Sequence, residues 1–419
     1  APCGDDATCF GLELTCNENW GVCVVADCTA EPDFTPCEVL TVPDRSFDIC
    51  VEGICVSPGC GDRTCNTPGP NWPLADTGQR TCSDAFGLRP SACTGTAGTD
   101  GCAATEFCGQ DAQYGWDTMH LEAERFARTE VGSDGVPGEP LVRDNVTGLV
   151  WAGCQAGRSG EGCRRGESGW FSWADAVAYC DSLEWGGYDD WRLPDVHELF
   201  SLADHRDSAA LMLDADAFPH SAAGLWSSSV RLSASSPFVA SFDGWIRPQT
   251  YVDFEHFVRC VRGGRLHERL RSPRFTRTEP VAGYPVVADA TTGLVWQGCE
   301  AGRSGTDCAG SPSRLSWSEA LAYCEGSAWA GFTDWYLPNV KELRSIVNDH
   351  REPPSVDPVA FPATSVGLFF SATSGVYYVG GSTGTEAVNG ASCVGNGDGT
   401  VVVEGKGRGA GVLCVREGP

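Results

Sequence analysis

Two short blocks of this sequence, each present twice, decide its architecture. Thr147-Gly-Leu-Val-Trp151 returns as Thr292-Gly-Leu-Val-Trp296, and Asp190-Trp-Arg-Leu-Pro194 returns as Asp334-Trp-Tyr-Leu-Pro338. Copies of about 140–145 residues are long enough to fold as domains, so the repeat predicts a tandem of globular domains rather than a solenoid. Further blocks recur in the same order: Arg125–Glu130 with Arg274–Glu279, Cys154–Gly160 with Cys299–Gly305, Ser172–Cys180 with Ser316–Cys324, and Val258–Gly263 with Val412–Glu417.

The pattern around these blocks predicts an α+β domain in each copy. Ser172-Trp-Ala-Asp175 and Ser316-Trp-Ser-Glu319 are typical of helix N-termini, because a hydroxyl caps the helix and an acid follows three residues later. A second helix is predicted to begin at Pro194 and at Pro338, with proline in the first helical turn. The closing segments, 257–261 and 411–415, are predicted to be core strands.

Cysteine usage indicates an oxidising compartment. The chain has 23 Cys, and fourteen of them lie between Cys3 and Cys108. No C-x-x-C pair occurs, and all seven His lie outside this dense region, so disulfides are favoured over zinc. The start at Ala1-Pro2-Cys3 fits a secreted protein whose signal peptide has been removed.

Charge and hydropathy exclude two classes of partner. Lys and Arg number 29 against 56 Asp and Glu, for a net charge of −27, which disfavours nucleic-acid binding. No apolar run is long enough to predict a membrane span. The predicted organisation is a disulfide-rich region at 1–70, a Cys-containing lead-in at 71–124, and two domains at 125–264 and 265–419.

Taken together, these motifs resemble the C-terminal domain family of the collagen-like adhesin Lcl. The motifs that carry the resemblance are T-G-L-V-W, S-W-x-x-A-x-x-Y-C, D-W-R-L-P-x-x-x-E-L, Trp226-Ser-Ser228 and the closing V-R-C-V-R-G-G at 258–264. The resemblance covers residues 74–419. It implies two tandem C-type-lectin-like α+β domains, related to formylglycine-generating enzymes, on a secreted or surface protein that binds rather than catalyses.

The resemblance also implies a disulfide pairing. A short loop closes at the same place in each copy, through Cys154–Cys163 and Cys299–Cys308. A longer link ties the first helix to the last strand, through Cys180–Cys260 and Cys324–Cys414. Cys393 has no counterpart in the first copy. An odd cysteine in a loop predicts a bridge to another chain or to the Cys-rich region, and the alternative is a buried free thiol.

The ligand surface is predicted in the long loops after the second helix, at 214–256 and 355–408, because loops on a rigid scaffold carry function. The second copy has Tyr336 where the first has Arg192, and Phe369-Phe370-Ser371 where the first has Trp226-Ser-Ser228. We therefore do not expect equal binding by the two copies. The candidate binding residues are Asp243, Trp245, Arg247, Tyr251, Asp253, Tyr377 and Tyr378.

Three other patterns each allow two interpretations. Asn396-Gly-Asp-Gly399 is either a turn or a calcium site using Asn396 and Asp398, and calcium is the one cofactor the sequence raises. Seven Arg between residues 259 and 277 are either a polyanion site or a tie to the acidic first 124 residues. The matched tryptophans are either a sugar platform or core, and their apolar neighbours favour core. These tryptophans are Trp151, Trp173, Trp191, Trp296, Trp317 and Trp335.

The favoured function is a secreted or cell-surface adhesion protein, on a bacterial surface, that binds a polysaccharide or surface glycan. The alternative is a disulfide-stabilised subunit of an extracellular fibre or surface layer, built by self-association of the two stackable domains. An enzyme of the formylglycine-generating type would need a reactive Cys pair that holds copper, whereas the matched cysteines here pair as staples. The sequence therefore predicts no enzyme activity.

Overall fold

The structure is a computed structural model of the 419-residue chain, and it describes residues 137–205 and 274–349 without a gap. The other described stretches are 14–17, 22–25, 36–37, 48–51, 54–56, 74, 77, 79, 81–84, 87–92, 109–114, 125–131, 213–221, 224–231, 236–241, 245–248, 254–263, 351, 353–381 and 384–418.

The first half of the tandem is built on a four-stranded antiparallel sheet with the order β16-β10-β9-β8. Trp151 of the T-G-L-V-W block lies at its centre, opposite Val142 on one side and Val261 on the other. The elements of this half are β8 (Phe126–Val131), β9 (Pro137–Asp144), β10 (Val150–Ala152), β11 (Arg158–Ser159), β12 (Arg165–Gly166), α3 (Trp173–Asp181), α4 (Val196–Ser201) and β16 (Val261–Arg262).

The second half repeats this plan. Its sheet has the order β17-β18-β19-β25, and Trp296 pairs with Val287 and Val415 as Trp151 does with its own neighbours. The elements are β17 (Phe275–Val281), β18 (Tyr284–Asp289), β19 (Leu294–Gln297), β20 (Arg303–Ser304), β21 (Ala309–Gly310), α5 (Trp317–Glu325), α6 (Val340–Ser345) and β25 (Val415–Glu417).

A six-stranded sheet with the order β13-β14-β15-β24-β23-β22 joins the two halves. β15 and β24 occupy matching places in the repeat and pair antiparallel at Ile246 and Val401, which are both fully buried. The predicted long loops at 214–256 and 355–408 are therefore wrong as loops, because much of each segment forms these strands. The strands are β13 (Leu225–Arg231), β14 (Ser236–Ser241), β15 (Trp245–Pro248), β22 (Leu368–Gly381), β23 (Gly384–Gly395) and β24 (Val401–Gly405).

One hydrophobic core is shared between the halves, and each half has a second core of its own. The shared cluster contains Trp151, Ile246, Trp296 and Val401. The separate clusters surround the long disulfides and hold the remaining matched tryptophans, of which Trp173 is only partly buried. The interpretation of these tryptophans as core is confirmed.

The helix starts follow local capping chemistry. α3 and α5 begin where predicted, and the Ser172 hydroxyl accepts a hydrogen bond from the Asp175 N–H. The second helices begin two residues later than predicted, at Val196 and Val340. Asp195 and Asn339 cap them, each in a reciprocal capping box with the glutamate three residues on, so the proline precedes the cap instead of opening the helix.

The four predicted disulfides are all present. They are Cys154–Cys163, Cys180–Cys260, Cys299–Cys308 and Cys324–Cys414. Cys393 is free and fully buried on β23, so its predicted loop setting is wrong and the buried thiol is what the structure shows. The pairing of the fourteen N-terminal cysteines lies outside the described residues.

The predicted closing strands are shorter than expected. β16 begins only at Val261, because the carbonyls before it accept hydrogen bonds from different segments. Phe257 O receives the Trp226 N–H, Val258 O the Ala156 N–H and Cys260 O the Ala152 N–H. The segment is thus a junction between loops and sheet rather than one long strand.

The lead-in before the tandem contacts both halves. Thr77 O accepts a hydrogen bond from the His205 N–H of the first half. Gln79 reaches the second half, where its amide bonds both the backbone and the hydroxyl of Ser374. The lead-in elements are β6 (Thr81–Asp84), β7 (Gly87–Ala92) and α1 (Asp111–Tyr114).

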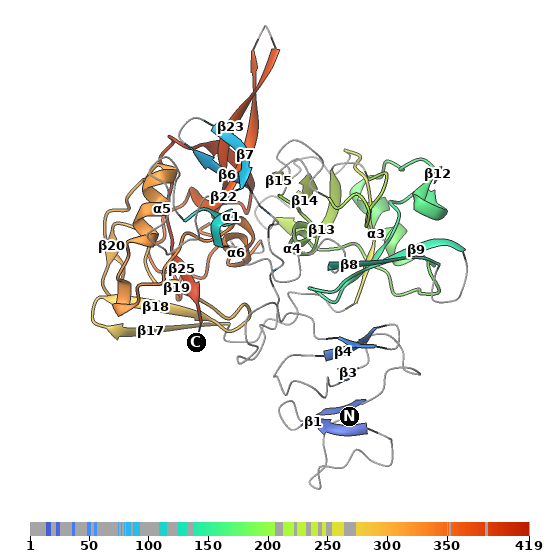
Figure 1. The fold of residues 1–419 in the computed structure, drawn as a ribbon, viewed down its shortest axis with the longest axis horizontal. Coiled ribbons are helices and arrows are strands. Elements are labelled where there is room, and N and C mark those ends of the chain that lie inside the picture. Colours follow the sequence, from blue (N-terminus) through green and yellow to red (C-terminus); the bar gives the residue numbers. More distant parts are fainter. Residues whose placement is uncertain are drawn as a thin grey trace.

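Figure 1 shows the two halves side by side, with α3 and α5 on their outer flanks and the β22–β23 hairpin projecting beyond the body. The described strands of the N-terminal region pair in a five-stranded sheet, made of β1 (Leu14–Asn17), β2 (Val22–Val25), β3 (Pro36–Cys37), β4 (Asp48–Val51) and β5 (Ile54–Val56). Among the described residues, no helix has the length and apolarity that crossing a bilayer requires.

Candidate functional site

The predicted ligand residues that the structure describes lie on two different strands of the joint sheet. The backbones of Trp245 and Arg247 lie in β15, an interior strand of the joint sheet, opposite Ser241 and Val239. Tyr377 and Tyr378 lie on β22, in the projecting hairpin (Figure 1). Asp243, Tyr251 and Asp253 lie outside the described residues.

The predicted calcium site is a turn held by its own hydrogen bonds. The Asn396 side chain accepts from the Gly367 N–H and donates to Ser365 O, each at 2.8 Å. Asp398 Oδ1 accepts from the N–H and the hydroxyl of Thr400. The amide of Asn396 is therefore committed to fastening the 365–367 segment, which favours the turn interpretation. No group of three His, Cys, Asp or Glu able to hold a metal occurs in the part of the chain that the structure describes.

The arginines near the junction of the two copies make structural contacts. Arg259 is fully buried and donates to Ala152 O and to the Ser221 hydroxyl. Arg262 bonds Asp190, and Arg274 bonds Asp289. Arg277 donates to Gly298 O and Ala360 O. These four arginines bond to partners within their own halves, which supports neither a polyanion site nor a tie to the acidic N-terminus. Arg265, Arg269 and Arg271 lie outside the described residues.

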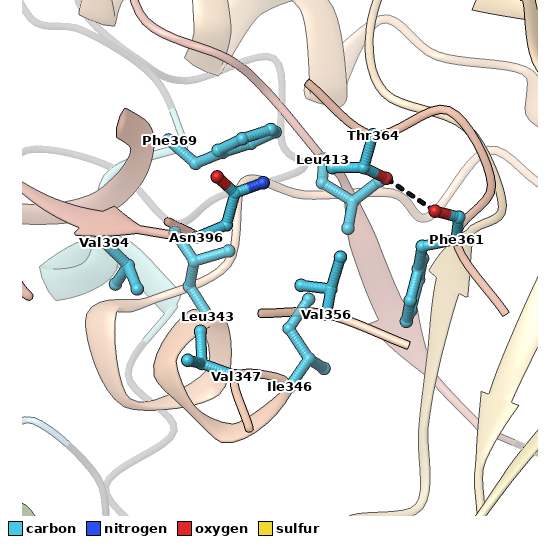
Figure 2. Close-up of a pocket in the computed structure, with 10 residues that line it drawn as sticks. All are labelled: Leu343, Ile346, Val347, Val356, Phe361, Thr364, Phe369, Val394, Asn396 and Leu413. Carbon is cyan, nitrogen blue, oxygen red and sulfur yellow. Dashed lines mark hydrogen bonds between the residues drawn. The ribbon is translucent and has the colours of Figure 1, made fainter. Parts of the chain in front are cut away.

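A pocket in the second half is a packing gap rather than a ligand site. It lies beside α6, among Leu343, Ile346, Val356 and Phe361, with the Asn396 amide at its edge (Figure 2). Its free space is about that of one water molecule, and its apolar lining residues belong to the shared core. A ligand larger than water would have to displace core side chains.

The described surface of the first half has two exposed large aromatic side chains. Trp170 is 59% exposed and Phe254 is 54% exposed, although both are large apolar side chains. The Trp170 ring stacks on Phe257, with 4.2 Å between ring centroids. We call the stacked rings of Trp170 and Phe257 the aromatic platform.

The backbone beneath the platform is firmly held. Phe171 and His256 exchange two backbone hydrogen bonds of 3.0 Å, which bring residues 170–171 alongside residues 254–257. The buried indole of Trp226 donates to Phe171 O at 2.8 Å. The rings above this frame are therefore held in place by a fixed backbone rather than by a free loop.

The imidazole of His256 completes the support. It packs edge-on against Trp226, with 4.7 Å between ring centroids. Burial lowers the pKa of His256 below its ordinary value. The imidazole is therefore neutral at physiological pH and brings no positive charge under the platform.

The second half lacks the platform at the equivalent place. The bridge between Leu315 and Ala410 matches the bridge between Phe171 and His256. Counting outward from these bridges, Trp170, Phe254 and Phe257 correspond to Arg314, Arg408 and Gly411. Arg314 instead donates to the Ser365 hydroxyl at 2.8 Å.

Sequence reasoning missed Trp170 and Phe254, although the signal was present. Aligning the two copies from Ser172 and Ser316 outward pairs Trp170 with Arg314. An aromatic residue at one copy of a repeat and a cation at the other indicates that the fold itself does not need the ring. The matched tryptophans drew attention instead, and those are the ones in the core.

The fold defines a class of protein: a disulfide-stapled α+β tandem whose two halves share one sheet and one core. Residues 140–262 and 285–416 each match the model of the Lcl C-terminal domain, inside the two predicted domain ranges. The two matches cover more than half of the chain, so the chain belongs to the Lcl C-terminal domain family. No curated protein matches it.

Proposed function

We propose that this protein is an extracellular adhesion protein of a bacterial surface that binds a glycan and catalyses no reaction. The observation that carries the proposal is the pair of domains of the Lcl C-terminal family, joined by one sheet and one core. We also propose that each half has the C-type-lectin-like fold, which the family resemblance implies.

The covalent chemistry supports an extracellular location. Two disulfides lie within each half, and such bonds persist in oxidising compartments. The platform supports binding rather than catalysis, because the rings of Trp170 and Phe257 carry no group that attacks a bond or transfers a proton.

The test is adhesion by the whole protein. The fluorescently labelled, disulfide-intact chain is applied to an array of glycans and to surfaces coated with extracellular polysaccharide. We expect saturable retention on a subset of glycans, and loss of retention after reduction and unfolding. Equal retention on every surface, or on none, would contradict the proposed function.

One observation favours a second candidate, a self-assembling subunit of a fibre or surface layer. β22 is the edge strand of the joint sheet, and it runs fourteen residues out into the projecting hairpin (Figure 1). A long strand edge is a template for pairing with another chain. Light scattering and electron microscopy of the purified chain test this candidate, and a monomer at all concentrations would rule it out.

A further inference from the structure

We propose that β22 pairs antiparallel with β22 of a second copy of this chain, which joins two joint sheets edge to edge in a closed dimer. Such a dimer goes beyond the proposed adhesive function, because it gives the whole chain a partner and a stoichiometry. It also differs from the fibre candidate, because a strand that pairs with itself around a two-fold axis leaves no free end for growth. β22 (Leu368–Gly381) contains no charged residue and no proline, the two kinds of residue that commonly protect an exposed strand edge.

The base of this edge is covered by the chain itself, which shows which peptide groups face outward. The outward N–H groups of β22 donate to other segments as far as Ser374. These bonds run from Phe370 N–H to Gly411 O, from Ala372 N–H to Pro338 O and from Ser374 N–H to Gln79 Oε1. Peptide groups alternate between the two sides of a strand, so the next outward groups belong to Val376, Tyr378 and Gly380.

Beyond Ser374 the hairpin is a two-stranded ribbon. β22 is the end strand of the joint sheet, and β24 pairs with β23 only from Gly390 to Val394. The described β6–β7 hairpin of the lead-in forms a sheet of its own and does not extend this one. Figure 1 shows the ribbon projecting beyond the body. Because two strands alone are marginally stable in water, pairing with a third strand stabilises them.

The repeat shows that the fold does not need this extension. β13 and β14 occupy the places of β22 and β23 in the first half, as the matching bridges of Leu225 with Phe257 and Phe369 with Gly411 show. They have seven and six residues, against fourteen and twelve in the second half. The extra length is therefore an addition to the second half, and we assign it to contact with another chain.

The opposite edge of the joint sheet selects β22 as the partner of β22. That edge is β13, and its outward N–H groups are used as far as Ser228. The bonds run from Trp226 N–H to Phe257 O and from Ser228 N–H to Pro194 O. Alternation then leaves only Val230 outward before β13 ends, whereas two copies of β22 offer three outward residues each. Pairing of β22 with β22 is thus favoured over head-to-tail pairing of β22 with β13.

Charge favours the same contact and predicts its dependence on salt. Residues 368–395 contain one charged residue, Glu386 on β23, in a chain of net charge −27. Pairing of β23 with β23 would bring two copies of Glu386 to one edge, and pairing through β22 avoids this. The two acidic bodies repel each other, and salt screens that repulsion. The dimer should therefore tighten as the salt concentration rises.

The experiment is analytical ultracentrifugation of the whole chain over a wide range of protein concentrations, at low and high salt. Tyr378→Pro removes an outward N–H and leaves the inward groups that bond β23, because proline lacks that donor. The matched control is Tyr378→Thr, which also removes the ring but keeps the N–H and a strong preference for strands. Circular dichroism, urea titration and non-reducing electrophoresis check that each variant keeps the fold and the disulfides.

We expect a reversible monomer–dimer equilibrium for the wild type and for Tyr378→Thr, and at least tenfold weaker association for Tyr378→Pro. A wild type that stays monomeric overturns the proposal, as does a Tyr378→Pro variant that associates as the wild type does. Equal loss in both variants assigns the contact to the ring and overturns the strand pairing. Growth of the wild type beyond a dimer overturns the closed pair and supports the fibre candidate. The glycan array tests adhesion separately, since a wild type that dimerises and binds no glycan removes the proposed function and leaves the dimer.

Discussion

At the scale of single residues, Cys393 shows how burial decides the chemistry of a side chain. Its thiol is fully buried on β23, between partners Phe370 on β22 and Val402 on β24. The sulfur makes a weak contact of 3.7 Å with Ala391 O. Burial raises the pKa of the Cys393 thiol well above its usual range, so the reactive thiolate does not form at neutral pH.

We therefore predict that Cys393 is inert in the folded protein. A maleimide added to the native chain should leave Cys393 unlabelled, and the same reagent in denaturant should label it completely. Peptide mapping by mass spectrometry reads both results. Cys393→Ser should not change the migration of the chain in non-reducing electrophoresis, and a dimer band that disappears in this variant would contradict the prediction.

The same scale shows what a local pattern does and does not reveal. The disulfides were predictable because the two copies place their cysteines alike and a family resemblance supplies the pairing. The burial of Arg259 was not predictable, because this residue lies at the edge of an arginine-rich run, and such runs usually lie on the protein surface. In the fold it is a buried cation that stacks over Phe218, and the second copy has Leu413 at the matching position.

At the scale of elements, the lead-in acts as a brace for the edge of the joint sheet. The buried Gln79 amide donates to Ser374 O at 2.9 Å and to the Ser374 hydroxyl at 2.8 Å, and it accepts from the Ser374 N–H. Asp111 on α1 accepts from the hydroxyls of Thr77 and Thr373. Residues almost three hundred positions apart are thus fixed to one another.

We predict that Gln79→Ala lowers the free energy of unfolding by about 2–3 kcal/mol, because it leaves buried donors and acceptors of Ser374 without partners. Urea titration followed by tryptophan fluorescence measures the change. Arg408→Ala is the control, since it removes an exposed ion pair with Glu404 whose loss should cost about 1 kcal/mol or less. Equal losses in the two variants would show that Gln79 does not brace the sheet.

Elements whose signals are local were predicted well, and elements whose partners are distant were not. The starts of α3 and α5 follow from a serine and an acid three residues apart. The six-stranded sheet depends on Ile246 meeting Val401, a pairing that no local periodicity reveals. Residues 214–256 and 355–408 were therefore predicted as loops, and Trp170 was missed because attention went to the tryptophans that the two copies share rather than to the position where they differ.

At the scale of the whole molecule, α4 and α6 join the halves through buried polar groups. His197 on α4 lies 3.1 Å from Asp349 and 3.3 Å from Arg344 of the second half. Lys341 of α6 donates to Ser201 O at the end of α4, at 3.0 Å. Burial lowers the pKa of His197, and the neighbouring Arg344 adds to this, so the interface holds a neutral imidazole.

This interface predicts a loss of stability in mild acid. The unfolded chain protonates His197 near pH 6.5, whereas the folded chain resists protonation until lower pH, so the unfolded state binds more protons as the pH falls below 6.5. Stability is therefore greatest above that pH and declines below it. Urea midpoints at pH 7.5 and 5.5 should differ more in the wild type than in His197→Gln. The pKa of His256 is also lowered by burial, so His256 adds a loss of stability in acid to both proteins. Its contribution therefore cancels when the two proteins are compared.

An equal pH dependence in the wild type and His197→Gln would contradict this prediction. Asp349 also contributes a pH-dependent term to stability, but at lower pH than His197. Burial alone would raise the pKa of Asp349, but Arg344 and His197 together hold it below its ordinary value. Its contribution is thus present above pH 3.8 and is lost only as the pH falls below that value, so it does not overlap with the histidine window.

The joint sheet and shared core predict that the two family domains behave as one folding unit. All four described disulfides lie within a half, so the contacts that join the halves are non-covalent: the β15–β24 pairing, the α4–α6 contacts and the shared core.

We insert a protease site between residues 263 and 274, cut it in the native protein, and follow the halves by gel filtration and calorimetry. The cut halves should co-elute, and the uncut tandem should melt in one transition, because neither half buries its share of the core alone. Ile246→Asp in the cut protein should separate the halves, since it places a carboxylate in the buried pairing of β15 with β24. Cut wild-type halves that elute apart, or two resolved melting transitions, would show instead two independent domains that merely touch.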